Sequence, residues 1–279
     1  MSEPEKSTLA KFRLDGRVAI LTGGIGLLGR QFTRTLVGAG ARVVIADRDA
    51  KTPSIAAGLA KECGGEVIGE SIDITQAAEV NALVARTVER WQKIDILINN
   101  AAIDPKFDVD VAGRQANTFE DYPLELWKQS LDVNLTGAFL CCQAVGKVMV
   151  RQKRGVIINI SSTYGVVAPD QRLYQRDGEA EQKLFKPASY AVTKAGIAHF
   201  SRYLAAYWAG QNIRVNTLTP HGIFNAQDEQ FTRRYNERST LERMATVDEM
   251  NGAILFLASD ASSYMTGSNL VVDGGWTAW

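Results

Sequence analysis

The stretch RVAILTGGIGLLG, residues 17–29, joins an apolar strand pattern to a glycine-rich turn. Gly24, Gly26 and Gly29 have the G-x-G-x-x-G spacing, in which the glycines permit a tight turn, a close approach to a pyrophosphate and a close helix–strand contact. A helix that begins in this turn would direct free N–H groups and its positive dipole end at the same anion. The stretch therefore predicts the first strand, turn and helix of a dinucleotide-binding sheet.

Apolar runs and helical patterns alternate along the rest of the chain. Further strands are expected at 42–47, 66–69, 95–99, 155–160, 213–218 and 269–273, with helices up to about 39 and at 55–61, 77–91, 124–151 and around Tyr190. Near-continuous apolar strands joined by helices indicate a parallel sheet covered on both faces. No linker divides residues 1–279, so we expect one α/β domain with a doubly wound parallel sheet of about seven strands (a Rossmann fold), entered through residues 12–16.

The composition argues against several classes of protein. The 31 basic and 31 acidic residues cancel, so neither a nucleic-acid nor a membrane partner is expected. No apolar run reaches the roughly 18 residues of a membrane span, and residues 1–11 lack a signal-peptide core, which predicts a cytoplasmic protein. Three cysteines and two histidines offer neither a disulfide framework nor the spacing of a metal site, so no metal is expected.

Two carboxylates follow strands at the edge where a ligand should bind. Asp47 ends the second strand, 18 residues beyond Gly29. A carboxylate there would accept both ribose hydroxyls of NAD and repel the 2′-phosphate of NADP, although the adjacent Arg48 would soften this preference. NAD is therefore predicted, with NADP as the less favoured cofactor. Asp73 would meet the adenine edge or, alternatively, cap the helix that begins near Thr75.

Tyr190 and Lys194 are four residues apart in a helical pattern, so their side chains should project from one face. A nearby ammonium favours the ionised phenol and lowers its pKa, which would make Tyr190 a usable general acid or base. Of the eight tyrosines, Tyr190 alone has a lysine four positions on. An incidental surface pair is the alternative interpretation.

Two further segments carry polar residues where a ligand could reach them. Asn134 and Gly137 are poor helix formers inside a helical pattern, so some gain must offset them. Ser161 and Ser162 follow the fifth strand, where period-two alternation sends them to opposite faces. We therefore expect only one of the two serines to face a cofactor.

Together these motifs resemble the short-chain dehydrogenase/reductase family of the short, single-domain type, from about Leu14 to Trp276. The matching segments are the turn at 22–29, Asn-Asn-Ala-Ala at 99–102 for the family's Asn-Asn-Ala-Gly, Tyr190-x-x-x-Lys194, and the C-terminal motifs at 264–267 and 272–275. The resemblance implies a catalytic tetrad of Asn134, Ser162, Tyr190 and Lys194. Ser162 would hold the substrate oxygen and Tyr190 would exchange its proton. Lys194 would bind the nicotinamide ribose, and Asn134 would hold a water.

The resemblance also implies the cofactor contacts and the assembly. The implied cofactor-binding residues are Gly23, Gly24, Ile25, Gly26, Leu28, Gly29, Asp47, Arg48, Asp73, Ile74, Asn100, Ala101, Ala102, Tyr190, Lys194, Pro220, Gly222 and Ile223. A homotetramer or homodimer is expected. The two tryptophans in the last four residues are costly in water, so residues 276–279 are expected to be buried between subunits.

Three segments depart from or extend the family pattern and suggest the substrate. Ser162 and Tyr190 are 28 positions apart, about twice the usual gap in the family, so residues 169–187 should form an insert over the substrate cleft. The loop 103–123 and a lid at 223–246 would complete three polar walls, which favour a sugar or sugar derivative. His221, between Pro220 and Gly222 where the family usually has Pro-Gly, would lie near the nicotinamide, either as a functional residue or as a loop histidine that packs on the cofactor. The predicted substrate contacts are Ser162, Arg172, Arg176 and His221, although a solvated loop is the alternative for the insert.

Several functions remain open at this stage. The insert also resembles, more loosely, family members associated with the modification of bacterial surface or flagellar glycans. The main prediction is an NAD-dependent oxidoreductase acting on a hydroxyl or carbonyl group of a polar small molecule. The alternatives are a 3-oxoacyl-type reductase, a sugar epimerase or dehydratase with bound NAD, and a catalytically silent NAD-binding protein.

Overall fold

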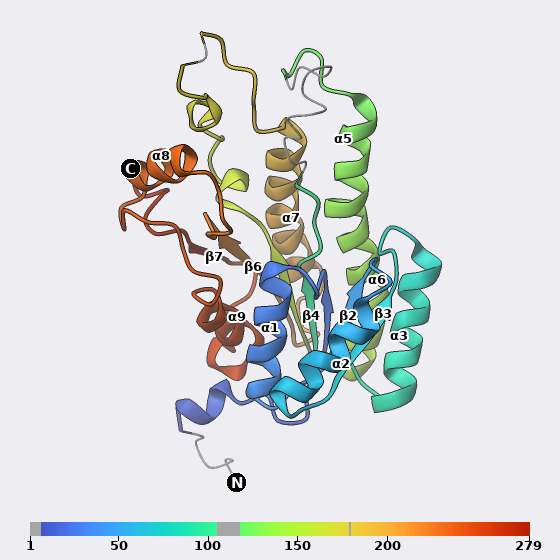
Figure 1. Ribbon diagram of the computed structural model, residues 1–279. Coiled ribbons are helices and arrows are strands. Elements are labelled where there is room, and N and C mark those ends of the chain that lie inside the picture. The colour runs from blue at the N-terminus through green and yellow to red at the C-terminus, as the bar shows by residue number, and fades with distance from the viewer. Residues whose placement is uncertain (1–6, 105–117, 179) are drawn as a thin grey trace.

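The computed structural model describes residues 7–104, 118–178 and 180–279 (Figure 1). Within these residues a seven-stranded parallel sheet has the order β3-β2-β1-β4-β5-β6-β7. The strands are β1 (Val18–Thr22), β2 (Arg42–Asp47), β3 (Val67–Ser71), β4 (Ile96–Asn99), β5 (Gly155–Ile160), β6 (Ile213–Pro220) and β7 (Asn269–Val272). This order confirms the predicted doubly wound α/β fold.

Helices cover both faces of the sheet and divide the core into two layers (Figure 1). One layer contains α1 (Leu27–Gly38), α2 (Thr52–Cys63) and α9 (Asn251–Ala258), and the other contains α3 (Ala77–Trp91), α6 (Ala138–Gln152) and α7 (Ala188–Tyr207). Successive strand residues alternate between the layers, as Ile20 and Leu21 do. Both faces need apolar side chains, which is why the strands were recognisable as continuous apolar runs.

Two strands end later in the structure than the sequence predicted, because their backbone pairing continues beyond the apolar residues. β3 continues to Ser71, which pairs with Asp47, and β6 continues to Pro220, which pairs with Val272. Hydrogen bonding between strands does not depend on side-chain polarity, so the pairing extends into residues that a hydrophobic pattern leaves out. These extensions carry β6 to the residue before His221.

The long helix expected at 124–151 is interrupted by a wider turn. It consists of α5 (Leu124–Leu131), a π-helical segment (Asp132–Gly137) and α6. Gly137 is needed there because a Cβ would lie 2.7 Å from Cδ1 of Ile74. Single π-helical turns inside α-helices occur often at functional sites. This turn is the structural counterpart of the two poor helix formers, Asn134 and Gly137.

By length and composition alone, residues 124–152 could cross a membrane, with a mean hydropathy of 1.4 in the most apolar window. However, 56 % of that window is buried inside the protein, where α6 packs against α3, β4 and β5. The apolar side chains of this helix are thus used in the core of the domain.

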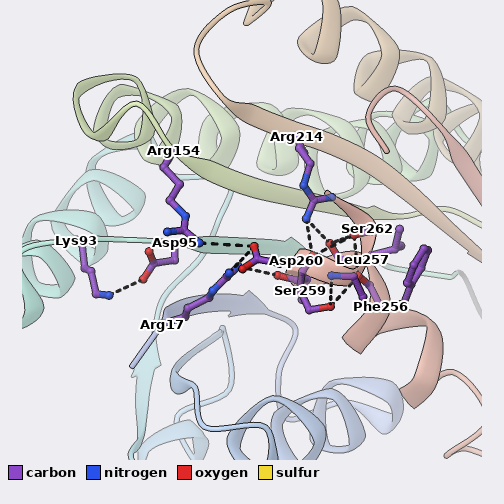
Figure 2. A network of polar contacts seen from close by, with 12 residues as sticks. Arg17, Lys93, Asp95, Arg154, Arg214, Phe256, Leu257, Ser259, Asp260 and Ser262 are labelled. Atoms are coloured by element: carbon purple, nitrogen blue, oxygen red, sulfur yellow. Dashed lines mark hydrogen bonds and ion pairs between the residues drawn. The ribbon is translucent and has the colours of Figure 1, made fainter. Parts of the chain in front are cut away.

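The amino ends of the strands are held by a network of arginines (Figure 2). Arg17, just before β1, forms a 2.6 Å ion pair with Asp260, and Arg154 approaches the same carboxylate at 3.6 Å. Arg214 donates hydrogen bonds to the carbonyl oxygens of Leu257 and Ser259 at the end of α9. Cations at a helix C-terminus satisfy its last carbonyls and complement its dipole. The network therefore joins three strands to α9 at the end of the sheet opposite the carboxyl ends.

The C-terminal tryptophans have different surroundings. Trp276 is buried within the chain itself, 4.7 Å from the ring of Tyr235 and 4.3 Å from that of His221, measured between ring centroids. Trp279 is 81 % exposed. The expectation that the whole segment 276–279 is buried between subunits is therefore wrong for Trp276, because α8 (Glu229–Arg238) already covers it through Tyr235.

Candidate active site

A cavity of about 820 Å³ lies at the carboxyl ends of the strands. Its wall contains Gly23 after β1, Asp47 at the end of β2, Asn100 after β4, Ser162 after β5 and Pro220 at the end of β6. The strand order reverses between β1 and β4, and ligands of doubly wound sheets bind at such a switch point. The topology thus brings together residues from the whole chain.

Most of the residues predicted to bind a cofactor line this cavity. They are Gly23, Gly26, Leu28, Asp47, Arg48, Asp73, Ile74, Asn100, Ala101, Ala102, Tyr190, Lys194, Pro220, Gly222 and Ile223. Gly24, Ile25 and Gly29 are not among the described residues of the wall. Gly29 acts from behind it, because a Cβ there would lie 2.3 Å from the carbonyl oxygen of Gly23. Gly23 itself has a φ of 64°, which favours glycine.

The glycine turn is tied to the end of β4 by hydrogen bonds. The Thr22 hydroxyl accepts from the backbone N–H groups of Asn100 and Ala101, both at 3.1 Å. The Asn100 amide donates to the carbonyl oxygens of Thr22 and Gly23, at 3.2 and 3.0 Å. A Cβ on Gly23 would lie 2.7 Å from Cα of Ala101. This close approach holds the two sides of the switch point together.

Of the two alternatives left open for Asp73, the structure rules out the helix cap and places the residue in the cavity wall. Asp73 lines the cavity, and its Oδ1 also accepts hydrogen bonds from the N–H and the hydroxyl of Thr75, at 2.9 and 2.8 Å. It does not cap α3, whose N-cap is Gln76. The bonds to Thr75 therefore set the position of a carboxylate that faces the cavity.

Tyr190 and Lys194 lie on α7 and both reach the cavity. The Lys194 ammonium donates a 2.9 Å hydrogen bond to the carbonyl oxygen of Ile160 and lies 5.7 Å from the centroid of the Tyr190 ring. Burial lowers the pKa of Lys194 to about 8, while the negative charge of Asp104 opposes this shift. The side chain is thus a buried amine at the junction of β5 and α7.

The pKa of Tyr190 differs from the sequence-based expectation. Burial raises it and the negative charge of Asp104 raises it further, while a hydrogen bond with Ser162 lowers it. The expected lowering by Lys194 is not found in this structure, because the ammonium is directed at Ile160. The phenol is therefore protonated at neutral pH, in the form that can donate a proton.

Both serines after β5 line the cavity, and that only one of them faces a cofactor stays a prediction. Their hydroxyls nevertheless differ in function. The Ser161 hydroxyl donates to the carbonyl oxygen of Lys194 at 2.6 Å, which ties β5 to α7. The Ser162 hydroxyl accepts from the N–H of Tyr164 at 3.2 Å and lowers the pKa of Tyr190. Ser162 is therefore the serine that is paired with the phenol.

Asn134 is buried in the π-helical turn and is not among the described residues of the cavity wall. Its side chain accepts from the N–H of Ile103 at 2.8 Å and donates to the Ile103 carbonyl oxygen at 3.0 Å. It also donates to the Thr193 hydroxyl at 3.1 Å. These bonds join the loop after β4 to α7, one residue from Lys194. Asn134 thus positions two elements that line the cavity.

His221 lines the cavity but is enclosed by aromatic rings. Its Nδ1 hydrogen-bonds the Thr163 hydroxyl, and its ring lies 4.9 Å from that of Tyr235 between centroids. Its Nε2 is buried and has no hydrogen-bond partner. Burial lowers the pKa of His221 to about 3, so the imidazole is neutral at physiological pH. The environment fits a packing role better than proton transfer.

The two arginines predicted to contact substrate are not among the described residues of the cavity wall. The side chain of Arg172 is 82 % exposed and pairs with Asp170 at 2.9 Å, and Arg176 is also exposed. Asp170 pairs in addition with Arg238 of α8, and Asp177 pairs with two further arginines of that helix. The insert thus docks on α8, part of the predicted lid, through its acidic residues.

One ion pair beside the cavity was not predicted. Lys186, in the insert, binds both carboxylate oxygens of Asp104, at 2.6 and 2.5 Å. The Lys186 ammonium lies 4.2 Å from the centroid of the Tyr190 ring. Asp104 lines the cavity. The only sequence signal was the excess of charged residues in the two long loops.

Known proteins resemble the chain over nearly its whole length. The family described as short chain dehydrogenase matches residues 17–174, and that described as enoyl-(acyl carrier protein) reductase matches residues 178–277. D-threitol dehydrogenase of Mycolicibacterium smegmatis is 34 % identical, with 95 % of each chain covered. Galactitol 2-dehydrogenase of Rhizobium johnstonii is 33 % identical over 96 % of this chain and 98 % of its own.

Two further relatives bear on substrate and cofactor. The 3-oxoacyl-[acyl-carrier-protein] reductase of a Synechocystis species is 32 % identical, covering 94 % of this chain and 97 % of its own. A crystal structure of gluconate 5-dehydrogenase from Burkholderia cenocepacia, in complex with NADP and tartrate, superimposes with a TM-score of 0.83. It is 32 % identical, with 98 % of this chain and 100 % of that chain covered.

Proposed function

The chain belongs to the short-chain dehydrogenase family, and we propose that it transfers a hydride between NAD(H) and a hydroxyl or carbonyl group of a sugar alcohol or related polyhydroxylated molecule. The observation that carries the proposal is the meeting of Ser162, Tyr190 and Lys194 in the same cavity as the glycine turn. Relatives that oxidise threitol and galactitol support the substrate class.

The residues of the cavity suit a dinucleotide. A Cβ at Gly23 or Gly29 would lie less than 3 Å from backbone atoms of the protein, so glycine permits this tight turn, and α1 begins directly after it. In this proposal the turn binds the pyrophosphate, Asp47 binds the adenine ribose, and Lys194 binds the nicotinamide ribose. When bound, the nicotinamide supplies or accepts the hydride.

The protein would contribute a proton and an orientation. The Ser162 hydroxyl would hold the substrate oxygen next to the Tyr190 phenol, which lines the same cavity. Tyr190 would exchange a proton with that oxygen, acting as general acid in reduction and general base in oxidation. Lys194 would provide positive charge beside the phenol once its ammonium turns from the Ile160 carbonyl oxygen. Asn134 would hold α7 and the loop after β4 in place relative to each other.

Asp47 is the residue on which we base the preference for NAD over NADP. Asp47→Ala is expected to weaken NAD binding by about 1.5–3 kcal/mol, since a hydrogen bond to a charged acceptor is lost, while NADP binding should weaken less or improve. Titration of both cofactors measures this. Asp49→Ala is the control, because Asp49 instead accepts from the N–H of Lys51. A wild-type preference for NADP, the cofactor bound in the gluconate 5-dehydrogenase structure, would contradict the assignment.

A substrate screen tests the proposed function. At least one of threitol, galactitol and arabinitol should reduce NAD to NADH, and a 3-oxoacyl thioester should not oxidise NADH. A 3-oxoacyl reductase remains the second candidate, because that activity also occurs among the relatives. Sugar phosphates and nucleotide sugars belong in the same screen, since they would reveal glycan-modification chemistry. Substrate conversion without net change in NADH would instead indicate an epimerase or dehydratase, and no turnover a silent binding protein.

We also propose that the enzyme is cytoplasmic and assembles as a homodimer or homotetramer. Free thiols at Cys63, Cys141 and Cys142 suit a reducing compartment. Tyr203 and Tyr207 are stacked on the outer face of α7, 58 % and 66 % exposed, and would be covered by a second subunit.

A further inference from the structure

An ion pair next to the proposed catalytic tyrosine has no part in the mechanism above. The side chain of Lys186 is only 9 % exposed, whereas that of its partner Asp104 is 50 % exposed. The Lys186 ammonium contacts the Tyr190 ring at 4.2 Å and lies 5.8 Å from that of Tyr164, measured to the ring centroids. A nearly buried cation thus stands between the phenol ring and a carboxylate that faces the cavity.

The backbone at or next to each partner is held by the side chain of another residue. The Lys186 N–H donates to Oε1 of Gln171 at 2.7 Å, and the Gln171 amide donates to the Lys186 carbonyl oxygen at 3.2 Å. Asp104 directly follows Ile103, both of whose backbone polar groups bind Asn134. The insert and the loop after β4 thereby fix the two ends of the pair. Such a supporting shell is what a recognition site requires.

Three other charged groups that line the cavity have different surroundings. Lys194 binds the Ile160 carbonyl oxygen, and Glu125 and Lys128 pair with each other on α5, with side chains 81 % and 54 % exposed. The charge of Asp104 also acts on both Tyr190 and Lys194, raising the pKa of each. Asp104 is therefore a carboxylate of the cavity wall that lies within electrostatic reach of both residues.

We propose that Asp104 accepts a hydrogen bond from a second hydroxyl of the substrate, close to the one that reacts, and that Lys186 is the positioning residue that holds Asp104 there. This inference rests on the proposed function and specifies its substrate class. A carboxylate accepts from hydroxyl groups and repels anions, so the pair selects neutral polyols over aldonates and sugar phosphates. The insert thus shapes specificity through Lys186, and not through Arg172 or Arg176.

The test compares the polyol oxidised best in the screen with gluconate used as a competitive inhibitor. Asp104→Asn and Asp104→Ala should lower kcat/KM for the polyol by about 10- to 100-fold, mainly through KM, because a charge-assisted hydrogen bond is lost. Both variants should bind gluconate about tenfold more tightly, since the repulsion is removed and Lys186 becomes available. A merely structural role of Asp104 would not tighten the binding of an anion.

Lys186 is tested by its own pair of variants. Lys186→Met should lower kcat/KM for the polyol without tightening the binding of gluconate. Lys186→Arg should retain most of the wild-type kcat/KM. Lys93→Met is the matched control, because it breaks the Lys93–Asp95 pair just before β4, at the amino ends of the strands. NAD affinity should be unchanged in all variants.

The outcomes separate the inference from the function on which it rests. A wild-type enzyme that oxidises none of the three polyols would reject the proposed function. A wild-type enzyme that oxidises a polyol, with unchanged polyol kinetics and gluconate inhibition in the Asp104 variants, would overturn the inference alone.

Discussion

Replacing Tyr190 by phenylalanine is expected to lower kcat for the polyol substrate by about 10²- to 10⁴-fold, the usual contribution of a general acid or base. The change removes only the phenol oxygen and leaves the half-buried ring in place. The ring still packs under Lys186, so the fold of α7 should be preserved. Steady-state kinetics measure kcat. NAD titration measures the affinity for NAD, which should be nearly unchanged.

Tyr203→Phe provides the control for this prediction. Tyr203 lies on the same helix, but its side chain is 58 % exposed and stacks on Tyr207 away from the cavity. The same loss of one hydroxyl should therefore leave kcat unaltered. Comparable turnover in Tyr190→Phe and wild type would show that the proton comes from another group and would reject the assignment of Ser162, Tyr190 and Lys194.

The second large effect is expected from Gly29→Ala. The added Cβ would lie 2.3 Å from the carbonyl oxygen of Gly23 and 2.6 Å from Cα of Gly24, so backbone atoms must move. Overpacking of this kind costs about 1–3 kcal/mol of unfolding free energy. Moving the turn also misaligns the N–H groups aimed at the pyrophosphate, which should weaken NAD binding by about 10- to 100-fold.

Gly38→Ala in the same helix is the matched control. Nothing lies within 4 Å of a Cβ at Gly38, so the substitution should be neutral or stabilise α1 by about 0.5–1 kcal/mol. Denaturant unfolding and NAD titration of both variants decide the matter. If Gly29→Ala binds NAD as wild type does, the turn is not the pyrophosphate site.

The fold was predictable because its signals are local. Each strand of a doubly covered parallel sheet must be apolar on both faces, so runs such as 42–47 and 155–160 stand out in the sequence. The glycine turn at 22–29 adds a backbone requirement that few other residues can meet. Since all carboxyl ends of parallel strands meet at one edge, the position of the cavity followed from the same pattern.

The polar details of the site depended on which partner each side chain finds. Arg172 forms an ion pair with Asp170, two positions before it, and its charge therefore lies on the surface of the insert. Trp276 is covered by Tyr235 from α8 within the same chain. Asn134 and Gly137 marked an irregularity, but that it is a π-helical turn bonded to Ile103 is visible only in three dimensions.

By itself, the sequence determined the doubly wound sheet, the dinucleotide turn and the residues that reach the carboxyl edge, because strand burial and glycine spacing are properties of short segments. Only the tertiary structure decided that Lys186 meets Asp104, 82 positions away, over the ring of Tyr190. That contact depends on the positions of the backbone at Ile103 and at Lys186, which are set by their hydrogen bonds to Asn134 and Gln171 and not by any periodic pattern. The pair proposed to select the substrate was therefore beyond the reach of sequence reasoning.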